Sequence, residues 1–469
     1  MTISHGRSSS LSFDWLTMAV YFSLVVVGAL MLYATDHKQE AASFELTASF
    51  SRQMVWVGVS LVAFLLVIVI DWKVWFTFAF PIFGLSLLLL VVVLIFGQEI
   101  KGAKAWISLF GFSFQPGEFA KLGTCLALSS YISSVRFSHQ NLKTTIIAIG
   151  IFVAPAFLIL LQPDAGSAIV FGSFLIMLYR TGMTPAIYIF GFALILVFVF
   201  SLIYSPNVVM LALFIAGLLF FVYQFDDNKL LWLGAVIAAA VASGVLFFQG
   251  FTMISLLGLS ALLGVFMVYH IQRRKSQFSL LLMGSVMLLS AFSFGSNYAF
   301  NKFLAPHQKD RINVWLQPEK TDPNGSRYNL IQSQVAIGSG GLQGKGFLNG
   351  TMTKLNYVPE QSTDFIFSTI GEEQGFLGSI GIVLLYTILL IRITQIGERS
   401  RHKFILHYAY GLAGILFFHY FINIGMTMGI MPIVGIPLPF ISRGGSALLI
   451  FSIMMAILLK MDMDRMTRF

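Results

Sequence analysis

Two apolar stretches contain ionisable residues at positions that could support chemistry. In "FSFQPGEFAKLGTCLALSSYI", Glu118 and Lys121 stand three residues apart, which places them on one face of a helix. Asp164 lies between two apolar runs in "LILLQPDAGSAIVF". Ionisable groups at membrane depth are costly and usually face a bundle interior or a wet cavity, so all three are candidate functional residues. The structural alternatives are an interhelical clamp formed by the Glu118 and Lys121 pair and a helix cap formed by Asp164.

A further carboxylate stands in a polar, glycine-rich stretch, where Asp322 precedes Pro323 in "TDPNG". Asp322 could act in catalysis, or it could cap a helix whose first residue is the proline. The local pattern favours neither interpretation, and a wider constellation is needed to decide.

The glycine run "AIGSGGLQGKG" invites a phosphate-binding interpretation, but it matches neither standard pattern. A P-loop needs a glycine five residues before the Gly-Lys pair and Ser or Thr after the lysine, where this chain has Ser339 and Gly346. Two interpretations remain: an anion-binding nest of backbone amides near residues 338 to 346 together with Lys345, or an ordinary turn.

More polar residues gather in "YVPEQSTDFIFSTIGEEQGFLGS" and in "MGIMPIVGIPLPFISRGGSALLIF". In the first, Glu360, Asp364, Glu372 and Glu373 stand near the predicted start of a helix, where the helix dipole favours them, and they are also potential cation ligands without EF-hand spacing. In the second, prolines and glycines interrupt the apolar run beside Arg443, as is tolerated where a broken helix lines protein or a watery cavity. This pattern suits a site for a lipid with a polar, anionic head.

The elements that must position these residues are membrane helices. The chain is 57% hydrophobic and only 10% charged, far too apolar for a soluble globular protein of 469 residues. Apolar runs of roughly 17 to 25 residues suit helices and not barrel strands, so we predict an all-α polytopic membrane protein with about fourteen transmembrane helices. The predicted spans lie near 14–35, 53–70, 73–96, 117–135, 144–161, 165–179, 184–204, 207–224, 230–249, 252–270, 279–297, 365–391, 404–426 and 441–460.

The positive charges of the short loops predict the orientation. With the N-terminus inside, the loops that contain Arg136, Lys143, Arg180 and residues 270–277 and 392–403 all face the cytoplasm, together with the C-terminal tail. The net charge of +9 therefore indicates topology, and nucleic acid is not an expected partner. The first apolar run is expected to stay as a signal anchor. A single cysteine, Cys125, excludes an internal disulfide.

The long segment 298–364 then faces outward. It is richer in aromatic and aliphatic residues than disordered segments are, so we predict that it folds back onto the bundle and is not disordered. "SRYNLIQSQVAI" is expected to form a short amphipathic helix that the following glycines end.

Five segments in order resemble the SEDS family of peptidoglycan glycosyltransferases, whose members include RodA, FtsW and SpoVE. They are "GAKAWI…FQPGEFAK", "QPDAGSA", "RINVWLQPEKTDPNGSRYNLIQSQVAIGSGGLQGKG", "YVPEQSTDFIFSTIGEEQGFLG" and "GIPLPFISRGGSALL". The resemblance covers most of the chain, and "AIGSGGLQGKG" is more similar to the elongation branch, RodA, than to FtsW. Departures include Ala105 in place of an arginine and Arg443 in place of a tyrosine.

The resemblance implies a SEDS-type helix bundle in the bacterial cytoplasmic membrane that polymerises lipid II into glycan strands on the outer face, for cell-wall elongation and cell shape. It implies that Asp322 is catalytic, that Glu118 and Lys121 form a central-cavity pair and that Asp164 is the family's intramembrane aspartate. The implied partners are a class B penicillin-binding protein, which is a transpeptidase, and other membrane proteins of the elongation complex.

The implied chemistry is an inverting transfer from an undecaprenyl-pyrophosphate-linked disaccharide, with Asp322 as general base for the acceptor hydroxyl. The leaving diphosphate needs cations or amides aimed at it, or a bound divalent cation such as magnesium or manganese. The candidate cations are Lys121, Arg311, Lys345 and Arg443, and Glu360 and Asp364 are further substrate-binding candidates in the same outer region.

The family usually has ten spans, so about four helices are predicted to be inserted here. We therefore divide the chain into an N-terminal membrane bundle (1–204), an extra transmembrane insert (205–278) and a C-terminal bundle (279–469) that includes the catalytic loop 298–364. Two other functions are a lipid II flippase and a scaffold for a transpeptidase. Both should tolerate Asp322→Asn, whereas a glycosyltransferase should not.

Overall fold

The computed structural model describes most of the chain, and its helices group into two units. The first unit comprises residues 1–183 and 322–469, and the second comprises residues 184–321. The described residues are 14–36, 48–100, 102–109, 112–134, 142–223, 229–272, 276–323 and 325–464.

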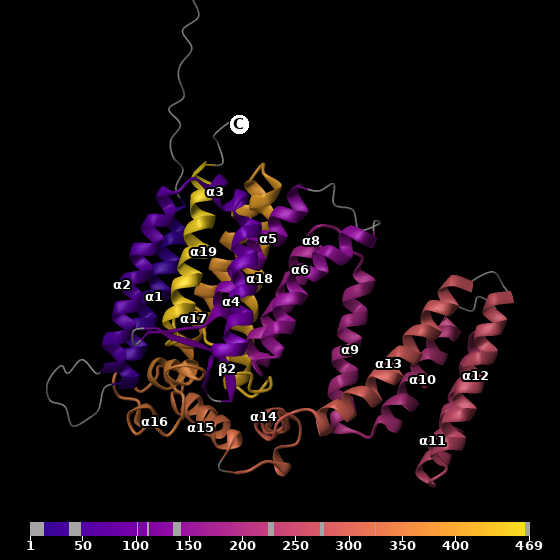
Figure 1. The fold of residues 1–469 in the computed structure, drawn as a ribbon. Helices are drawn as coiled ribbons and strands as arrows, with labels where there is room; N and C mark the ends of the chain where they lie inside the picture. The colour runs from indigo at the N-terminus through magenta and orange to yellow at the C-terminus, as the bar shows by residue number, and fades with distance from the viewer. Residues whose placement is uncertain are drawn as a thin grey trace, which may run out of the picture. The chain divides into compact units, whose positions relative to one another are not determined.

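The first unit is a helix bundle with a small sheet at one end (Figure 1). Within it, α19 packs against α2, α5 packs against α4 and α18, and α17 packs against α18. Its helices are α1 (Trp15–Asp36), α2 (Ala48–Val69), α3 (Trp72–Thr77), α4 (Ala79–Phe96), α5 (Pro116–Ser134), α6 (Leu142–Leu160), α7 (Ala165–Val170), η1 (Phe171–Ser173), α8 (Phe174–Arg180), α15 (Ser326–Ser339), α16 (Thr351–Lys354), α17 (Ile366–Arg399), α18 (Lys403–Thr427) and α19 (Gly445–Met463).

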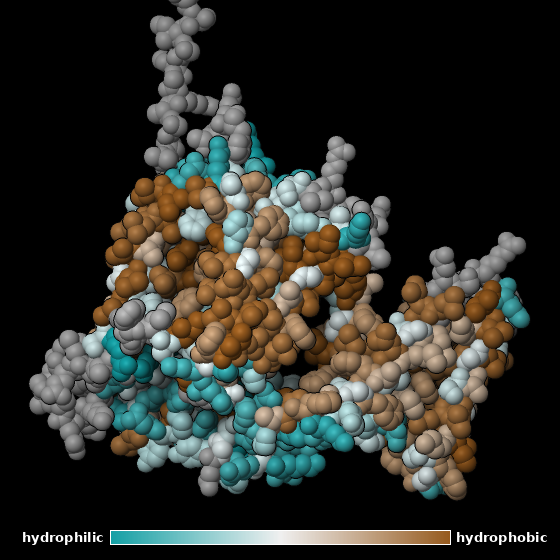
Figure 2. Space-filling view, viewed as in Figure 1, coloured by the Kyte–Doolittle hydropathy of each residue, from teal (hydrophilic) through white to brown (hydrophobic). Residues whose placement is uncertain are grey.

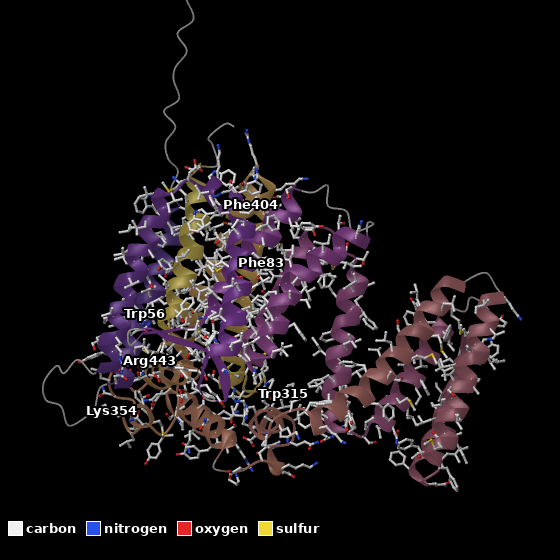
Figure 3. The ribbon with its side chains drawn as sticks, viewed as in Figure 1. Trp56, Phe83, Trp315, Lys354, Phe404 and Arg443 are labelled. Atoms are coloured by element: carbon white, nitrogen blue, oxygen red, sulfur yellow. The ribbon has the colours of Figure 1, made fainter. Side chains whose placement is uncertain are left out.

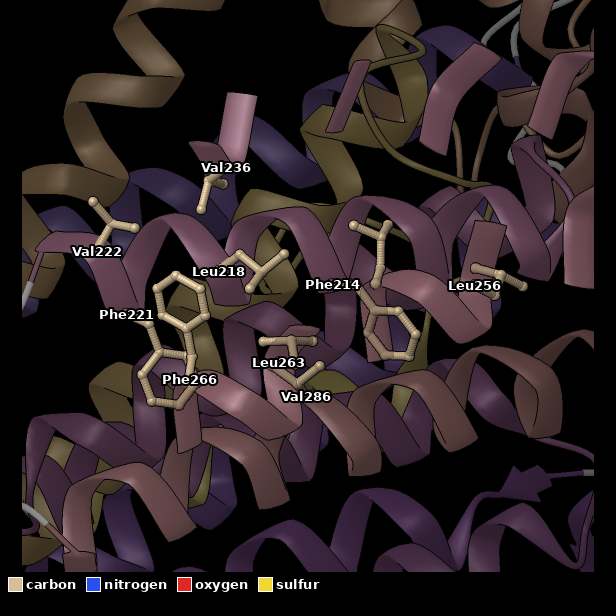
Figure 4. Close-up of a cluster of buried hydrophobic side chains, with 10 residues drawn as sticks. Phe214, Leu218, Phe221, Val222, Val236, Leu256, Leu263, Phe266 and Val286 are labelled. Carbon is tan, nitrogen blue, oxygen red and sulfur yellow. The ribbon is translucent and has the colours of Figure 1, made fainter. Parts of the chain in front are cut away.

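The second unit has an apolar core of its own. Phe214, Leu218, Phe221, Leu263 and Phe266 are buried against one another between α10, α12 and their neighbours (Figure 4). Its helices are α9 (Pro185–Ile203), α10 (Pro206–Tyr223), α11 (Lys229–Phe248), α12 (Thr252–Gln272), α13 (Ser276–Lys302), α14 (Pro306–Leu316) and η2 (Pro318–Lys320).

The helices confirm the predicted fold class. Within the described residues, twelve helices are long and apolar enough to cross a membrane. Two more predicted spans are helical but differ in kind: α5 contains Glu118 and Lys121, and the span predicted at 165–179 is broken into α7, η1 and α8. On the face shown in Figure 2, hydrophobic residues cover the middle of the first unit, and hydrophilic residues gather at the end that carries α15 and α16. The chain is a multi-pass membrane protein.

A three-stranded antiparallel sheet, which the sequence analysis did not predict, precedes α5. Its strands are β1 (Gln98–Ile100), β2 (Ala103–Leu109) and β3 (Phe112–Phe114), in the order β1-β2-β3. Two strands of three residues, one of them paired through a register shift, are too short for a period-two pattern to be visible in the sequence. Trp106 belongs to β2 of this sheet.

The predicted outer loop is folded. Residues 298–302 complete α13, and the remainder forms α14, η2, α15 and α16. The unit boundary falls inside this loop, between Thr321 and Asp322, and the second unit begins at Thr184. It therefore extends beyond the predicted insert 205–278 at both ends. The assignment of 205–278 as an insert stays a prediction.

At the end of the first unit that lies opposite α15 and α16 (Figure 1), Asp14 joins the start of α1 to the end of α17. Its carboxylate accepts hydrogen bonds from the Thr17 N–H at 3.0 Å, Arg392 at 2.7 Å and Arg399 at 2.8 Å. Burial alone would raise the pKa of Asp14, but the hydrogen bonds from Thr17 and the charge of Arg392 outweigh it and leave the pKa below its usual value.

Candidate functional site

Glu118 and Lys121 form a buried ion pair within α5. Lys121 Nζ lies 2.7 Å from Glu118 Oε1, and both side chains are almost completely excluded from the surface. Because both residues belong to one helix, the pair alone is not the interhelical clamp considered above. Burying two charges is costly unless their remaining polar atoms also find partners. We therefore expect a further polar partner on a neighbouring helix.

The partner on the neighbouring helix is His419 of α18, a residue that the sequence did not single out. Its Nε2 lies 2.8 Å from Lys121 Nζ, and its Nδ1 lies 3.0 Å from the carbonyl oxygen of Pro437. A protonated lysine only donates, so Nε2 accepts and the proton lies on Nδ1, where it can reach Pro437. Glu118 Oε2 is buried and has no hydrogen-bond partner among the described residues. A histidine inside an apolar run was the only available signal for this contact.

Asp164 is the N-cap of α7. Its carboxylate accepts hydrogen bonds from the Ser167 N–H at 3.0 Å, the Ser167 hydroxyl at 2.8 Å and Gln115 Nε2 at 2.9 Å. The structural alternative considered for this residue, a helix cap, is therefore what the structure shows. Asp164 also ties α7 to the segment that leads into α5.

Asp322 does not cap a helix. The following helix, α15, begins at Ser326, and its N-cap is Gly325. The carbonyl of Asp322 accepts the Gly325 N–H at 3.2 Å, so Asp322 opens a turn, and its side chain is exposed. The capping interpretation of "TDPNG" is wrong because the chain makes this turn before the helix begins.

The helix that follows Asp322 is anchored to the bundle. Ser333 Oγ donates to the carbonyl of Thr427 at 3.0 Å, and Gln334 Nε2 donates to that of Met428, also at 3.0 Å. These bonds join α15 to the end of α18 and give Asp322 a fixed support.

The glycine segment does not form an open anion-binding nest. Its amides pair with α17: Lys345 N–H donates to Glu372 O at 3.0 Å and Gly346 N–H to Glu373 O at 2.9 Å. In return, Phe376 N–H donates to the carbonyl of Gly341 at 2.9 Å. The pairing is possible because α17 is interrupted at Gly375, whose φ is 64°.

The side chain of Lys345 forms an ion pair within the protein. Its Nζ lies 2.6 Å from Glu372 Oε1. The Glu372 carboxylate, which is fully buried, accepts further hydrogen bonds from the N–H groups of Met352 at 2.8 Å and Thr353 at 2.9 Å. Lys345 and Glu372 therefore hold the segment after α15 against α17. Of the predicted acidic cluster, Glu372 and Glu373 are both buried, and only for Glu372 are these side-chain hydrogen bonds present among the described residues.

The predicted broken helix before α19 is an irregular, non-helical segment that is hydrogen-bonded to the loop 360–364. Arg443 N–H donates to Ser362 O at 2.8 Å, and Ser442 Oγ donates to Thr363 O at 2.6 Å. Asn423 of α18 donates to both the carbonyl of Asp364 at 2.9 Å and that of Ile436 at 2.8 Å. His419, which contacts Lys121, also contacts Pro437 in this segment. The segment before α19 is therefore in contact with both the buried Lys121 side and the loop that contains Asp364.

A pocket of about 370 Å³ opens beside this segment. Trp56 and Arg443 lie at the same end of the first unit (Figure 3). Helix α2, the sheet, the 360–364 loop and the start of α19 all contribute to its wall. It is lined by Arg52, Gln53, Trp56, Ile100, Trp106, Ser113, Glu360, Thr363, Arg443, Gly444 and Gly445.

The structure thus brings Glu118 and Lys121 together, and brings Glu360 together with Arg443. Arg311 belongs to α14, which is part of the second unit. Among the described residues, no group of three or more His, Cys, Asp and Glu side chains is arranged to hold a metal ion.

Comparisons with known proteins identify relatives over nearly the whole chain. Residues 14–228 and 207–467 match the FtsW/RodA/SpoVE family, described as cell cycle proteins. The peptidoglycan glycosyltransferase RodA of Treponema pallidum is 32% identical over 437 residues, which cover 93% of this chain and 94% of the relative. The peptidoglycan glycosyltransferase MrdB of Escherichia coli strain K12 is 29% identical over 445 residues, covering 94% and 92%.

Solved structures show the same fold. A structure described as the coordination of polymerization and crosslinking by a peptidoglycan synthase complex aligns with a TM-score of 0.61 and 24% identity, covering 97% of this chain and 99% of that chain. The crystal structure of the rod shape determining protein RodA of Thermus thermophilus aligns with a TM-score of 0.54 and 22% identity, covering 98% and 100%. The chain belongs to the FtsW/RodA/SpoVE family.

Proposed function

We propose that this protein is a peptidoglycan glycosyltransferase that polymerises lipid II into glycan strands for cell-wall elongation. Two relatives that are 32% and 29% identical over nearly the whole chain are named as enzymes of this activity. The observation that carries the assignment of a catalytic residue is the position of Asp322, an exposed carboxylate on the turn before α15, which is itself hydrogen-bonded to α18.

In the proposed reaction, Asp322 accepts the proton of the acceptor's GlcNAc 4-hydroxyl as that oxygen attacks the anomeric carbon of the donor sugar. The bond from this carbon to the diphosphate breaks, and the electron pair leaves with the undecaprenyl diphosphate. One in-line displacement inverts the α-linked donor to a β-1,4 product, so no covalent enzyme intermediate forms. The proton on Asp322 is then released to water.

The leaving diphosphate needs positive charge. Lys121 and Lys345 already have carboxylate partners at 2.7 Å and 2.6 Å, whereas Arg443 lines the pocket at the rim of the first unit. A magnesium or manganese ion is a further candidate, and one held mainly by the diphosphate would need few protein ligands. A chelator followed by added metal tests this part of the proposal.

The remaining features of the proposal concern location and partners. Lys and Arg in the short loops support cytoplasmic N- and C-termini and an outward-facing catalytic loop. The peptidoglycan synthase complex with the same fold supports a class B penicillin-binding protein as partner, together with other membrane proteins of an elongation complex.

The test is polymerisation of labelled lipid II by the purified protein with its cognate transpeptidase, comparing wild type with Asp322→Asn at equal folding and partner binding. Polymer from wild type alone supports the proposal. Equal polymer from both proteins removes Asp322 from the mechanism. No polymer from either favours a lipid II flippase or a transpeptidase scaffold.

A further inference from the structure

We propose that the pocket between α2, the sheet and the start of α19 is a binding site for an anionic saccharide. The inference rests on the proposed glycosyltransferase function for its choice of ligand, and it adds a defined subsite with a stated chemistry. The volume of about 370 Å³ falls within the range of small-ligand pockets, which is roughly 300 to 1,000 Å³.

The aromatic part of the wall suits a sugar ring. Trp56 from α2 and Trp106 from β2 both line the pocket. Indole rings offer a large apolar face together with one N–H donor, which fits the mixed apolar and hydroxyl surface of a pyranose. Gln53, Ser113 and Thr363 add an amide and two hydroxyls that can bond to sugar hydroxyls.

The position of Trp56 is set by a glycine. A Cβ atom on Gly445 would lie 2.3 Å from three atoms of the Trp56 ring, so the ring packs directly on the main chain at the start of α19. Trp56 is therefore held in place before any ligand binds, which lowers the entropic cost of binding.

The charged part of the wall favours an anion. The lining contains two arginines, Arg52 and Arg443, and one carboxylate residue, Glu360. The main chain of Arg443 is held by its N–H bond to Ser362, and within the described part of the chain no ion pair to its guanidinium is present. A guanidinium can bind phosphate or carboxylate through two parallel hydrogen bonds.

Two parts of the proposed substrates share this chemistry. One is the diphosphate that links the donor sugar to its lipid, and the other is the set of carboxylates on the peptide carried by the disaccharide. The diphosphate is bonded directly to the sugar, the peptide carboxylates are carried by the same disaccharide, and the experiment below separates the two.

The experiment measures binding to the full-length protein in detergent by calorimetry, with two probes. The first probe is the soluble disaccharide-pentapeptide without phosphate, and the second is a polyprenyl diphosphate without sugar. We expect Arg443→Gln to weaken binding of at least one probe by about tenfold or more, because it removes a charged hydrogen-bond donor. Weakening of the first probe identifies the peptide carboxylates as the anion, and weakening of the second identifies the diphosphate.

The matched control is Arg401→Gln, since Arg401 is an exposed arginine that does not line the pocket. It should bind both probes as the wild type does. Arg443→Lys keeps the charge and should recover part of the affinity, and Trp106→Leu gives a second route into the pocket if an Arg443 variant does not fold. Equal affinity of wild type, Arg443→Gln and Trp106→Leu for both probes, or binding of neither probe to the wild type, overturns the proposal.

Failure of this subsite is distinguishable from failure of the proposed function. Asp322→Asn should bind both probes normally while losing polymerisation. Normal binding by Arg443→Gln, together with loss of activity in Asp322→Asn, removes the subsite and leaves the glycosyltransferase. Binding that depends on Arg443 in a protein that makes no polymer keeps the subsite and removes the activity.

Discussion

The glycine segment 338–346 and the Arg443 pocket are both polar, basic and rich in glycine, yet their polar groups are used differently. In the glycine segment, backbone amides donate to α17, and Lys345 is paired with the buried Glu372. In the pocket, Arg443 is held through its main chain, and its side chain forms part of the wall of a cavity. Similar sequence patterns therefore form support in one place and the wall of a cavity in the other.

This contrast predicts which measurement each region affects. Changes in the glycine segment should lower stability, because each removed group leaves a buried partner unsatisfied. Changes in the pocket should alter binding with little effect on stability, since surface substitutions usually change stability by less than about 0.5 kcal/mol.

The largest expected effect is that of Glu372→Ala. It leaves Lys345 and the N–H groups of Met352 and Thr353 without their common acceptor, and loss of one partner of a buried ion pair typically costs about 3 to 5 kcal/mol. Thermal unfolding in detergent measures it. Glu398→Gln on the same helix is the control, because its pair with Arg180 is exposed and should contribute less than about 1 kcal/mol. Similar losses of stability in Glu372→Ala and Glu398→Gln would contradict the structural role given to the glycine segment.

The next effect is that of Gly344→Ala. The new Cβ would lie 2.1 Å from the carbonyl oxygen of Glu373, and the φ of 80° disfavours any side chain, so we expect a loss of about 2 kcal/mol or more. Gly338→Ala is the control in the same segment, because nothing lies within 4 Å of its Cβ and alanine favours helix. Denaturant or thermal midpoints that fall equally for both would show that the close approach to α17 does not matter.

The buried cluster of Glu118, Lys121 and His419 is intermediate between the glycine segment and the pocket. Lys121 contacts two side chains, but Glu118 Oε2 has no partner among the described residues. His419→Leu removes the contact with Lys121 and the bond to Pro437, and we expect about 1 to 3 kcal/mol of destabilisation. His407→Leu on the same helix should cost less, because His407 Nδ1 is buried without a described partner. A larger loss of stability for His407→Leu than for His419→Leu would contradict the assignment of His419 as a partner of Lys121.

The smallest effect is a pH dependence at Asp14. Its pKa is lowered in the folded protein, so its contribution to stability is complete above the unfolded pKa of about 3.9 and is lost as the pH falls through the folded pKa. Asp14→Asn should therefore be less stable than wild type at neutral pH, and the difference should begin to shrink as the pH falls below about 4 and vanish below the folded pKa. Parallel stability curves down to pH 3 would argue against the ion pairs with Arg392 and Arg399.

The sequence predicted the helices well because their signals are local. Residues 326–339 form a helix where "SRYNLIQSQVAI" predicted one, and the predicted spans correspond to helices. Capping of α7 by Asp164 was also among the alternatives considered, since a cap joins residues that are close in the chain. The sheet was missed because two of its three strands have only three residues and its pairing does not follow from composition.

By itself, the sequence determined that this chain is a membrane-spanning helix bundle, because apolar runs of sufficient length have few other stable structures. It also supplied the motifs that match the FtsW/RodA/SpoVE family. Only the tertiary structure decided which polar groups are support and which line a cavity. Lys345 meets Glu372, Lys121 meets His419, and Trp56 meets Gly445 across long separations in the chain, and such contacts depend on packing that no local pattern encodes.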